Sequence, residues 1–145
     1  MLDSKSVYFL KNWNDNVVNW NEALINYNQS VLLGNLPSQG GTKGKDGFYV
    51  SHDANKIGKV KKVLRDNNLN YAHLYFNIVT QAKTFGKHKD TIDVWFWQCQ
   101  GVTKWIIEDK EEYILNAGDL IYIPKGFHHE VVPLSPRLGI SMSNE

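Results

Sequence analysis

The stretch from Gly118 to His129, with the sequence GDLIYIPKGFHH, decides the fold more than any other part of the chain. A glycine opens a run of aliphatic and aromatic residues, a composition that favours a β-strand, and Pro124 and Gly126 end that run in a turn. A histidine then begins the returning segment. The stretch therefore predicts two neighbouring strands joined by a short turn, with an imidazole at the start of the second strand.

Residues that favour β-strands continue through the second half of the chain. From residue 70 onward, β-branched and aromatic runs are separated by turn residues at short, regular intervals. The expected strands cover residues 71–80, 92–98, 104–108, 112–115, 119–124, 128–132 and 138–143. This spacing predicts a mainly β fold built around a compact antiparallel barrel.

Two amphipathic helices are expected ahead of the barrel. Apolar residues recur three and four positions apart in residues 15–27, where Asn14 or Asp15 is placed to cap the helix, and again in residues 55–67. The apolar positions are Val17, Trp20, Leu24 and Tyr27 in the first helix and Ile57, Val60 and Leu64 in the second. The basic residues of the second helix are expected to form a solvated face.

The length of 145 residues is typical of one domain. We expect residues 1–69 to form a helical and loop part that packs on a barrel made by residues 70–145. Residues 34–47 are rich in glycine and polar residues, which favours a loop. Such a loop is either a plain connection or a lid that closes over the mouth of the barrel.

The composition argues against several kinds of partner. Sixteen basic residues oppose fifteen acidic ones, so the net charge of +1 gives no reason to expect a nucleic acid or an anionic membrane. No run of apolar residues approaches the ~20 that a membrane-spanning helix needs. Cys99 is the only cysteine, which excludes an internal disulfide and favours the reducing cytoplasm.

Metal chemistry is indicated by the segment around His88 and Asp90. These residues are two positions apart, so on an extended backbone their side chains point to the same side. A histidine from the Gly118–His129 stretch would complete a set of two imidazoles and one carboxylate. That set is typical of non-haem Fe(II) sites because it leaves coordination positions open.

Both segments resemble a known family. Gly118–His129 fits the second cupin motif, in which glycine, five residues, proline, one residue, glycine and two residues precede a histidine. The segment HKDTIDV at 88–94, followed by glycine, lysine and tryptophan at 101, 104 and 105, resembles the cupin-like JmjC hydroxylases, which include the ribosomal oxygenases. Together the two motifs mark the barrel, which covers about half the chain. The resemblance implies a double-stranded β-helix of the jelly-roll type, with Fe(II) as the metal and 2-oxoglutarate as the cosubstrate.

The resemblance also implies which residues hold the metal. By position, His88 and Asp90 are the first two ligands and His129 is the third. His128 is adjacent to His129, so its side chain is expected on the opposite face of the strand.

The residue that binds the distal carboxylate of the cosubstrate is less easily assigned. The position of the family's basic residue falls on Thr103 in this chain, and the neighbouring Lys104 faces the other way in a regular strand. A bulge would turn Lys104 inward. Alternatively Arg137, eight residues after His129, supplies the charge, as an arginine late in the barrel does in other 2-oxoglutarate oxygenases. Hydrogen bonds to the cosubstrate are expected from Tyr75, Asn77 or Thr103.

The expected activity is hydroxylation of a protein or small molecule, coupled to oxidative decarboxylation of 2-oxoglutarate. Two alternatives stay open, because the cupin motif does not by itself choose a reaction. One is a metal-dependent dioxygenase or isomerase that does not use 2-oxoglutarate, and the other is a non-catalytic cupin that binds a small ligand. A homodimer is a further possibility, since barrels of this type often pair.

Overall fold

The computed structural model describes residues 5–34, 47–81 and 84–145. Nearly all of the predicted loop at 34–47 lies outside these ranges, and with it the predicted lid. Within the described residues, no helix has the length and apolar character needed to span a membrane.

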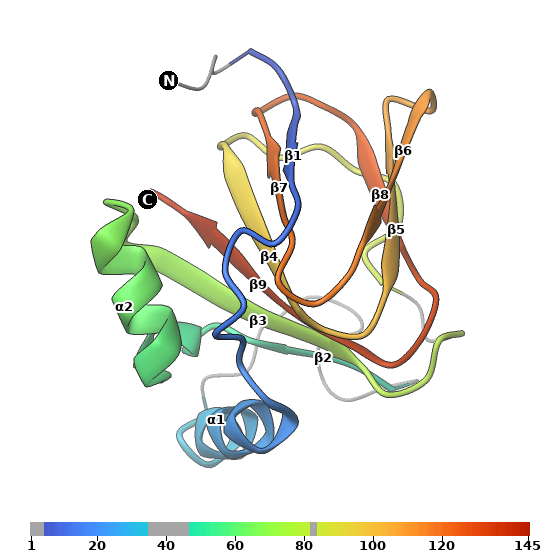
Figure 1. Ribbon diagram of the computed structural model, residues 1–145. Coiled ribbons are helices and arrows are strands. Elements are labelled where there is room, and N and C mark those ends of the chain that lie inside the picture. Colours follow the sequence, from blue (N-terminus) through green and yellow to red (C-terminus); the bar gives the residue numbers. More distant parts are fainter. Residues whose placement is uncertain (1–4, 35–46, 82–83) are drawn as a thin grey trace.

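The described chain is mainly β, with two antiparallel sheets and two helices of the N-terminal part, as expected (Figure 1). The larger sheet has the strand order β1-β7-β4-β9-β3-β2 and the smaller one the order β6-β5-β8. The strands are β1 Tyr8–Leu10, β2 Phe48–Ser51, β3 Tyr71–Asn77, β4 Val94–Gln100, β5 Thr103–Ile107, β6 Glu111–Leu115, β7 Leu120–Ile123, β8 His129–Pro133 and β9 Arg137–Ser143. Figure 1 shows the sheets facing each other, with α1 and α2 beside the larger one, away from the smaller one.

The seven strands predicted after residue 70 are confirmed as β3 to β9, with ends shifted by a few residues. Sequence reasoning missed β1 and β2. Both are short edge strands, at opposite ends of the larger sheet, and each pairs with a longer partner, β7 or β3. The N-terminal part therefore contributes strands to the barrel as well as helices.

The prediction for the start of the first helix was wrong. Helix α1 covers Trp20–Leu32, and its N-cap is Asn19 rather than Asn14 or Asp15. The Glu22 amide donates to the Asn19 side chain at 2.8 Å, and the Asn19 amide donates to the Glu22 carboxylate at 3.0 Å. This capping box satisfies two amides that a helix start otherwise leaves free, so the helix begins there.

Helix α2, Gly58–Asp66, follows a short 3₁₀ helix, Ala54–Lys56, and confirms the second predicted helix. Its buried residues are Val60, Val63 and Leu64. They pack against the outer face of the larger sheet.

The larger sheet separates two hydrophobic cores. The core on its outer face combines residues of both helices with alternate residues of β3, β4 and β9. The inner core lies between the two sheets and is formed by Phe96, Trp105, Ile107, Leu115, Ile121 and Ile123. Alternation along the strands therefore decides which side chains face the interior of the barrel.

Gly139 on β9 is fixed by this inner packing. It lies opposite Tyr75 of β3 and opposite Gln98 of β4, and a Cβ built on it would overlap the ring of Phe96. The missing side chain lets Phe96 cross the strand and stack with Tyr75, with 6.3 Å between their ring centroids.

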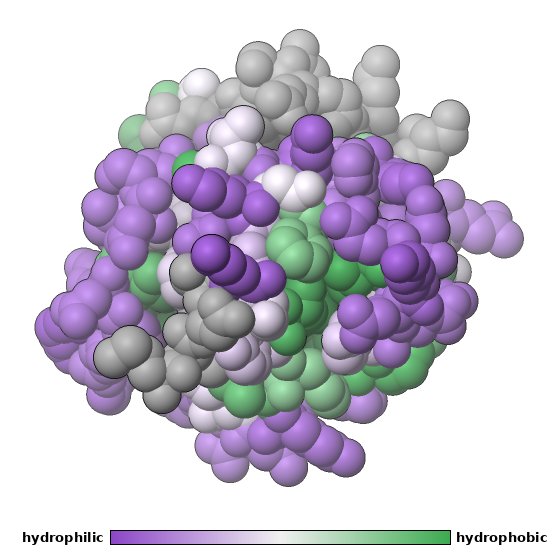
Figure 2. Space-filling model, turned by 90° about the horizontal axis from the view of Figure 1, so that it is seen from above, coloured by the Kyte–Doolittle hydropathy of each residue, from purple (hydrophilic) through white to green (hydrophobic). Residues whose placement is uncertain are grey.

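The barrel is hollowed at one end. The connection between β7 and β8 lies at the top of Figure 1, and Figure 2 views the molecule from that side. Figure 2 shows apolar residues in the middle of this face, set below a surrounding of hydrophilic residues. An apolar hollow with a polar rim is the usual form of a small-molecule site.

Candidate metal centre

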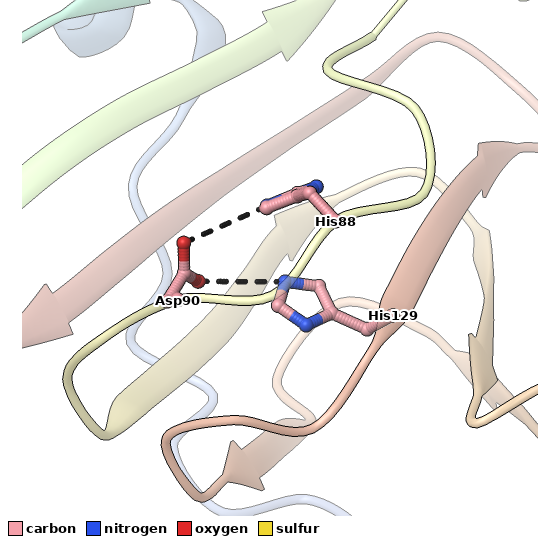
Figure 3. Close-up of side chains that lie close together, drawn as sticks. All are labelled: His88, Asp90 and His129. Atoms are coloured by element: carbon pink, nitrogen blue, oxygen red, sulfur yellow. Dashed lines mark ion pairs between the residues drawn. The ribbon is translucent and has the colours of Figure 1, made fainter.

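Three side chains with metal-binding groups converge in the barrel, namely His88, Asp90 and His129. Their ligand atoms all lie within 4.8 Å of one another. The Asp90 carboxylate lies between the imidazoles, with 3.8 Å from Oδ1 to His88 Nε2 and 3.5 Å from Oδ2 to His129 Nε2 (Figure 3). The residues that the sequence nominated are thus close enough to share one ion.

The backbone explains why they meet. His88 and His129 form an isolated antiparallel bridge, in which each amide donates to the other's carbonyl, at 3.0 and 2.8 Å. Directly opposed residues of an antiparallel pair project to the same face, so both rings lie on one side. Asp90 follows two residues after His88, and the Gly126 amide fixes it by donating to its carbonyl at 2.9 Å.

Main-chain acceptors also set the orientation of both imidazoles. His88 Nδ1 lies 2.8 Å from the Gly86 carbonyl oxygen, and His129 Nδ1 lies 3.1 Å from that of Phe127. A carbonyl can only accept, so each Nδ1 carries the hydrogen and each Nε2 keeps its lone pair. Both lone pairs are then available beside the Asp90 carboxylate, which is the arrangement that a metal ion requires.

Burial keeps His129 in the form that binds metals. The ring is buried, and this burial lowers the pKa of His129, although its hydrogen bond to the Phe127 carbonyl acts in the opposite direction. Metal ligation needs the neutral imidazole. The environment of His129 therefore favours ligation near neutral pH.

His128 lies on the other side of the chain, as the alternation predicts. Its Nδ1 is 3.4 Å from a carboxylate oxygen of Glu108, and its side chain is 44% exposed. His128 is therefore turned away from Asp90 and toward solvent.

The three residues line a pocket of about 330 Å³ between the sheets. Its walls are mainly aromatic and aliphatic, with Phe48, Phe85, Phe96, Trp105, Val94 and Val131 among them. The polar groups on the wall include Tyr75, Ser141 and Arg137. An apolar pocket with a few converging polar groups suits a small ligand with charged ends.

Arg137 is the cation of this pocket. It is 2% exposed, its Nε donates to Asn77 Oδ1 at 2.7 Å, and its Cζ lies 5.6 Å from the centre of the Phe48 ring. Burial lowers the pKa of Arg137 to about 10, so it remains charged at neutral pH. Among the described residues, Nη1 has no hydrogen-bond partner and no carboxylate pairs with the guanidinium. A buried cation without a counter-ion is costly, which makes this end of the pocket a site for an anion.

Tyr75 and Asn77 lie near this arginine, on β3. Tyr75 lines the pocket beside Ser141, with which it forms a hydrogen bond, and burial raises the pKa of Tyr75 so that the hydroxyl keeps its proton. Asn77 orients the guanidinium through the bond to Nε. Tyr75 therefore belongs to the anion end of the pocket, whereas Asn77 does not line the pocket and acts on it through Arg137.

Thr103 and Lys104 do not line the pocket. The Thr103 hydroxyl is buried, donates to Gln98 Oε1 at 3.1 Å and accepts from Trp105 Nε1 at 3.2 Å. Lys104 lies on the opposite face of β5, and β5 pairs with both neighbours without a break in register. The bulge expected to turn Lys104 inward is therefore absent from β5, and the larger sheet has its irregularity in β4, between Gln98 and Gln100.

Sequence reasoning missed Phe48 and Ser141 as pocket residues. Ser141 could have been found, because it lies four residues after Arg137 and two after Gly139 on one face of β9. Phe48 gave no such signal, since it belongs to the short strand β2 that sequence reasoning also missed.

Comparisons with known proteins bear on the family resemblance and on the fold. A family model described as the JmjC domain matches residues 107–145, which include His129 and Arg137. A search of curated protein sequences found no match. Among solved structures, the ribosomal oxygenase YcfD from Escherichia coli has a TM-score of 0.75 at 16% identity, over 98% of this chain and 49% of that one.

Two further structures show the same kind of fold. YcfD in complex with cobalt and 2-oxoglutarate has a TM-score of 0.73 at 18% identity, over 98% of this chain and 49% of that one. KdgF from Halomonas sp. has a TM-score of 0.51 at 18% identity, over 70% of this chain and 83% of that one. The chain thus spans about half the length of the ribosomal oxygenase structures. The resemblance to the cupin-like JmjC family is confirmed, by a family-model match in the C-terminal strands and by a fold shared over nearly the whole chain.

Proposed function

We propose that the chain is an Fe(II)- and 2-oxoglutarate-dependent oxygenase that hydroxylates a C–H bond of a protein or small molecule. The observation that carries the proposal is that buried Arg137, with Nη1 unpartnered among the described residues, lines the same pocket as His88, Asp90 and His129. A cupin that binds only a metal has no need of a buried cation there. A dicarboxylate that reaches from a metal to a cation does need one.

The donor set suits the metal. Two imidazole Nε2 atoms and one carboxylate, from His88, His129 and Asp90, would hold Fe(II) and leave further positions free. When Fe(II) and 2-oxoglutarate are bound, oxygen converts 2-oxoglutarate into succinate and carbon dioxide, with one oxygen atom entering succinate and the other entering the C–H bond of the second substrate.

The remaining pocket residues bind and orient. Arg137 would pair with the distal carboxylate of 2-oxoglutarate, Asn77 would keep the guanidinium in place, and the Tyr75 hydroxyl would add a hydrogen bond. The aromatic wall around Phe85 and Trp105 would exclude water from the reacting centre. Thr103 and Lys104 have no role in this proposal because they do not line the pocket.

The strand order supports one particular type of β-barrel. The chain passes from the larger sheet in β4 to the smaller sheet in β5 and β6, and returns in β7, before β8 and β9 repeat the alternation. We infer from this that the two sheets form a double-stranded β-helix.

Succinate formation tests the activity. Purified protein is supplied with Fe(II), oxygen and 2-oxoglutarate, and Arg137→Lys and Arg137→Ala are compared with Lys104→Ala. We expect succinate from the wild type and from Lys104→Ala, and little from either Arg137 variant. An iron-loaded protein that neither binds nor converts 2-oxoglutarate would leave a metal-dependent cupin of another chemistry.

A further inference from the structure

A row of ring side chains continues from the pocket along the inner face of β3. Tyr71, His73 and Tyr75 alternate with buried apolar residues of the outer face. His52, next to β2, stacks on His73 with 4.1 Å between ring centroids, and Tyr71 contacts the same ring edge-on at 4.7 Å. The His73 ring is therefore held on two sides, beside a tyrosine that lines the pocket.

The two nitrogens of His73 have different surroundings. Nδ1 lies 3.3 Å from the Tyr75 hydroxyl oxygen, whereas Nε2 is buried and has no partner among the described residues. Burial, with a smaller effect of His52, lowers the pKa of His73 to about 4, so the ring is neutral at pH 7 and carries one hydrogen. That hydrogen is on one nitrogen or the other.

Counting hydrogen-bond partners decides between the two tautomers. A hydrogen on Nε2 would leave a buried N–H without an acceptor, which is rarer and more costly in proteins than an unused acceptor. A hydrogen on Nδ1 donates to the Tyr75 oxygen and leaves only a lone pair on Nε2. The Tyr75 oxygen then accepts from His73, and its own hydrogen must point elsewhere.

The Ser141 hydroxyl also bonds to Tyr75, and it donates to the same oxygen, because its hydrogen bond lowers the pKa of Tyr75. With His73 and Ser141 both donating, the direction left for the Tyr75 hydrogen is the pocket, where the Arg137 guanidinium also has an unused donor. A carboxylate bound there would accept from both groups at once. With the Nδ1–H tautomer, such a ligand satisfies the Tyr75 hydrogen and Arg137 Nη1 together. With the other tautomer, the N–H of His73 would stay without an acceptor even in the complex.

We propose that His73 is a positioning residue, which donates from Nδ1 to Tyr75 and so directs the Tyr75 hydroxyl toward a carboxylate ligand paired with Arg137. The proposal rests on the proposed function only for the identity of that ligand, 2-oxoglutarate. His73 itself does not line the pocket, so it acts through Tyr75.

The first test is the tautomer, which requires neither metal nor activity. In ¹⁵N-labelled metal-free protein at pH 7, we expect the NMR signals of His73 to report a protonated Nδ1 and a bare Nε2. A protonated Nε2 overturns the proposal, whatever the protein does with 2-oxoglutarate.

The second test is calorimetric titration of 2-oxoglutarate into Mn(II)-loaded protein. His73→Phe keeps a ring in the stack but removes the donor, and we expect about tenfold weaker binding, the loss of one hydrogen bond to a charged ligand. His73→Asn keeps a donor at the δ position and should bind within about threefold of the wild type. His52→Phe is the matched control for the stack and should bind as the wild type does.

A double-mutant cycle separates positioning from a general structural effect. In a Tyr75→Phe background, His73→Phe should cause no further loss of affinity, because the hydroxyl that it directs is already gone. Equal losses with and without the Tyr75 hydroxyl would contradict the proposal. If the wild type bound no 2-oxoglutarate at all, the proposed function would fail, and the tautomer would still decide the role of His73.

Discussion

His88 and His129 are hydrogen-bonded to each other through both main chains while their rings lie side by side, 4.4 Å apart between centroids. The bridge joins the segment before β4 to the first residue of β8, so two distant parts of the chain supply the two imidazoles. The main-chain bridge by itself brings the two candidate ligands together. Such preorganisation lowers the cost of ordering side chains on binding.

This relationship predicts how variants respond to metal. His88→Ala and His129→Ala should each weaken binding of Mn(II) or Co(II) by about 100-fold or more, because each removes one of three ligands. Isothermal titration measures the affinity. The matched control is His128→Ala, which removes the neighbouring imidazole that faces Glu108 and should bind within about threefold of the wild type. The reverse pattern, with loss in His128→Ala alone, would show that the ligand assignment is wrong.

Buried His73 predicts a pH dependence of stability. Its pKa is lowered to about 4 in the fold, so the unfolded chain binds a proton more readily, and stability falls as the pH drops from 6.5 toward 4. The groups around the ring are His52, Tyr71 and Tyr75, none of which offers a negative charge near neutral pH to stabilise a protonated His73.

The expected loss from this residue between pH 7 and pH 5 is about 2 kcal/mol, measured by urea unfolding at both values. His73→Phe should lose less stability over the same range. His128→Phe, at an exposed histidine, serves as the control and should keep the full dependence. An unchanged pH dependence in His73→Phe would mean that His73 takes up its proton in the folded state as readily as in the unfolded chain.

The capping box of α1 predicts a local effect on stability. Asn19→Ala removes the side-chain acceptor of the Glu22 amide and should lower the free energy of unfolding by about 1 kcal/mol. Asn21→Ala, at an exposed position in the same first turn, should change it by less than about 0.5 kcal/mol. Equal losses in both variants, by chemical denaturation, would argue against the cap at Asn19.

The close contact at Gly139 predicts that even one methyl group is not tolerated. Gly139→Ala places a Cβ into the ring of Phe96 and should destabilise the fold by about 1–3 kcal/mol. Gly58→Ala is the matched control, because a Cβ there meets nothing within 4 Å and lies in the first turn of α2. Thermal unfolding compares the two, and a Gly139→Ala protein as stable as the wild type would show that Phe96 can move aside.

The fold could be predicted where a local pattern and a long-range contact agree. The GDLIYIPKGFHH stretch gave both strands β7 and β8 and the position of His129, because strand, turn and motif coincide there. The predicted start of α1 was wrong because the apolar spacing alone extended the helix toward the N-terminus, past the capping box at Asn19. Strand β1 has only three residues, and its pairing with β7 depends on a contact across the whole chain, which no local pattern contains.

The candidate site, like the fold, could be predicted from the sequence only in part. The alternation of side chains along a strand predicted that His88 and Asp90 point the same way and that His128 points away from them. Both predictions are confirmed, because this alternation holds in any extended segment. The choice between Arg137 and Lys104 could not be made from the sequence, since it depended on whether β5 contains a bulge. The regular pairing of β5 leaves Lys104 outside, whereas Arg137 is buried at the pocket wall.

The most direct test of the central claim is a calorimetric titration of 2-oxoglutarate into the protein, with and without bound Mn(II), for the wild type, Arg137→Lys and Lys104→Ala. Mn(II) accepts the same oxygen and nitrogen ligands as Fe(II). We predict one binding event per chain that requires the metal, is weakened about 10- to 100-fold in Arg137→Lys, where the two-point grip is lost, and is unchanged in Lys104→Ala. Metal-loaded wild-type protein that binds no 2-oxoglutarate, or that binds it equally well without metal, would contradict the account.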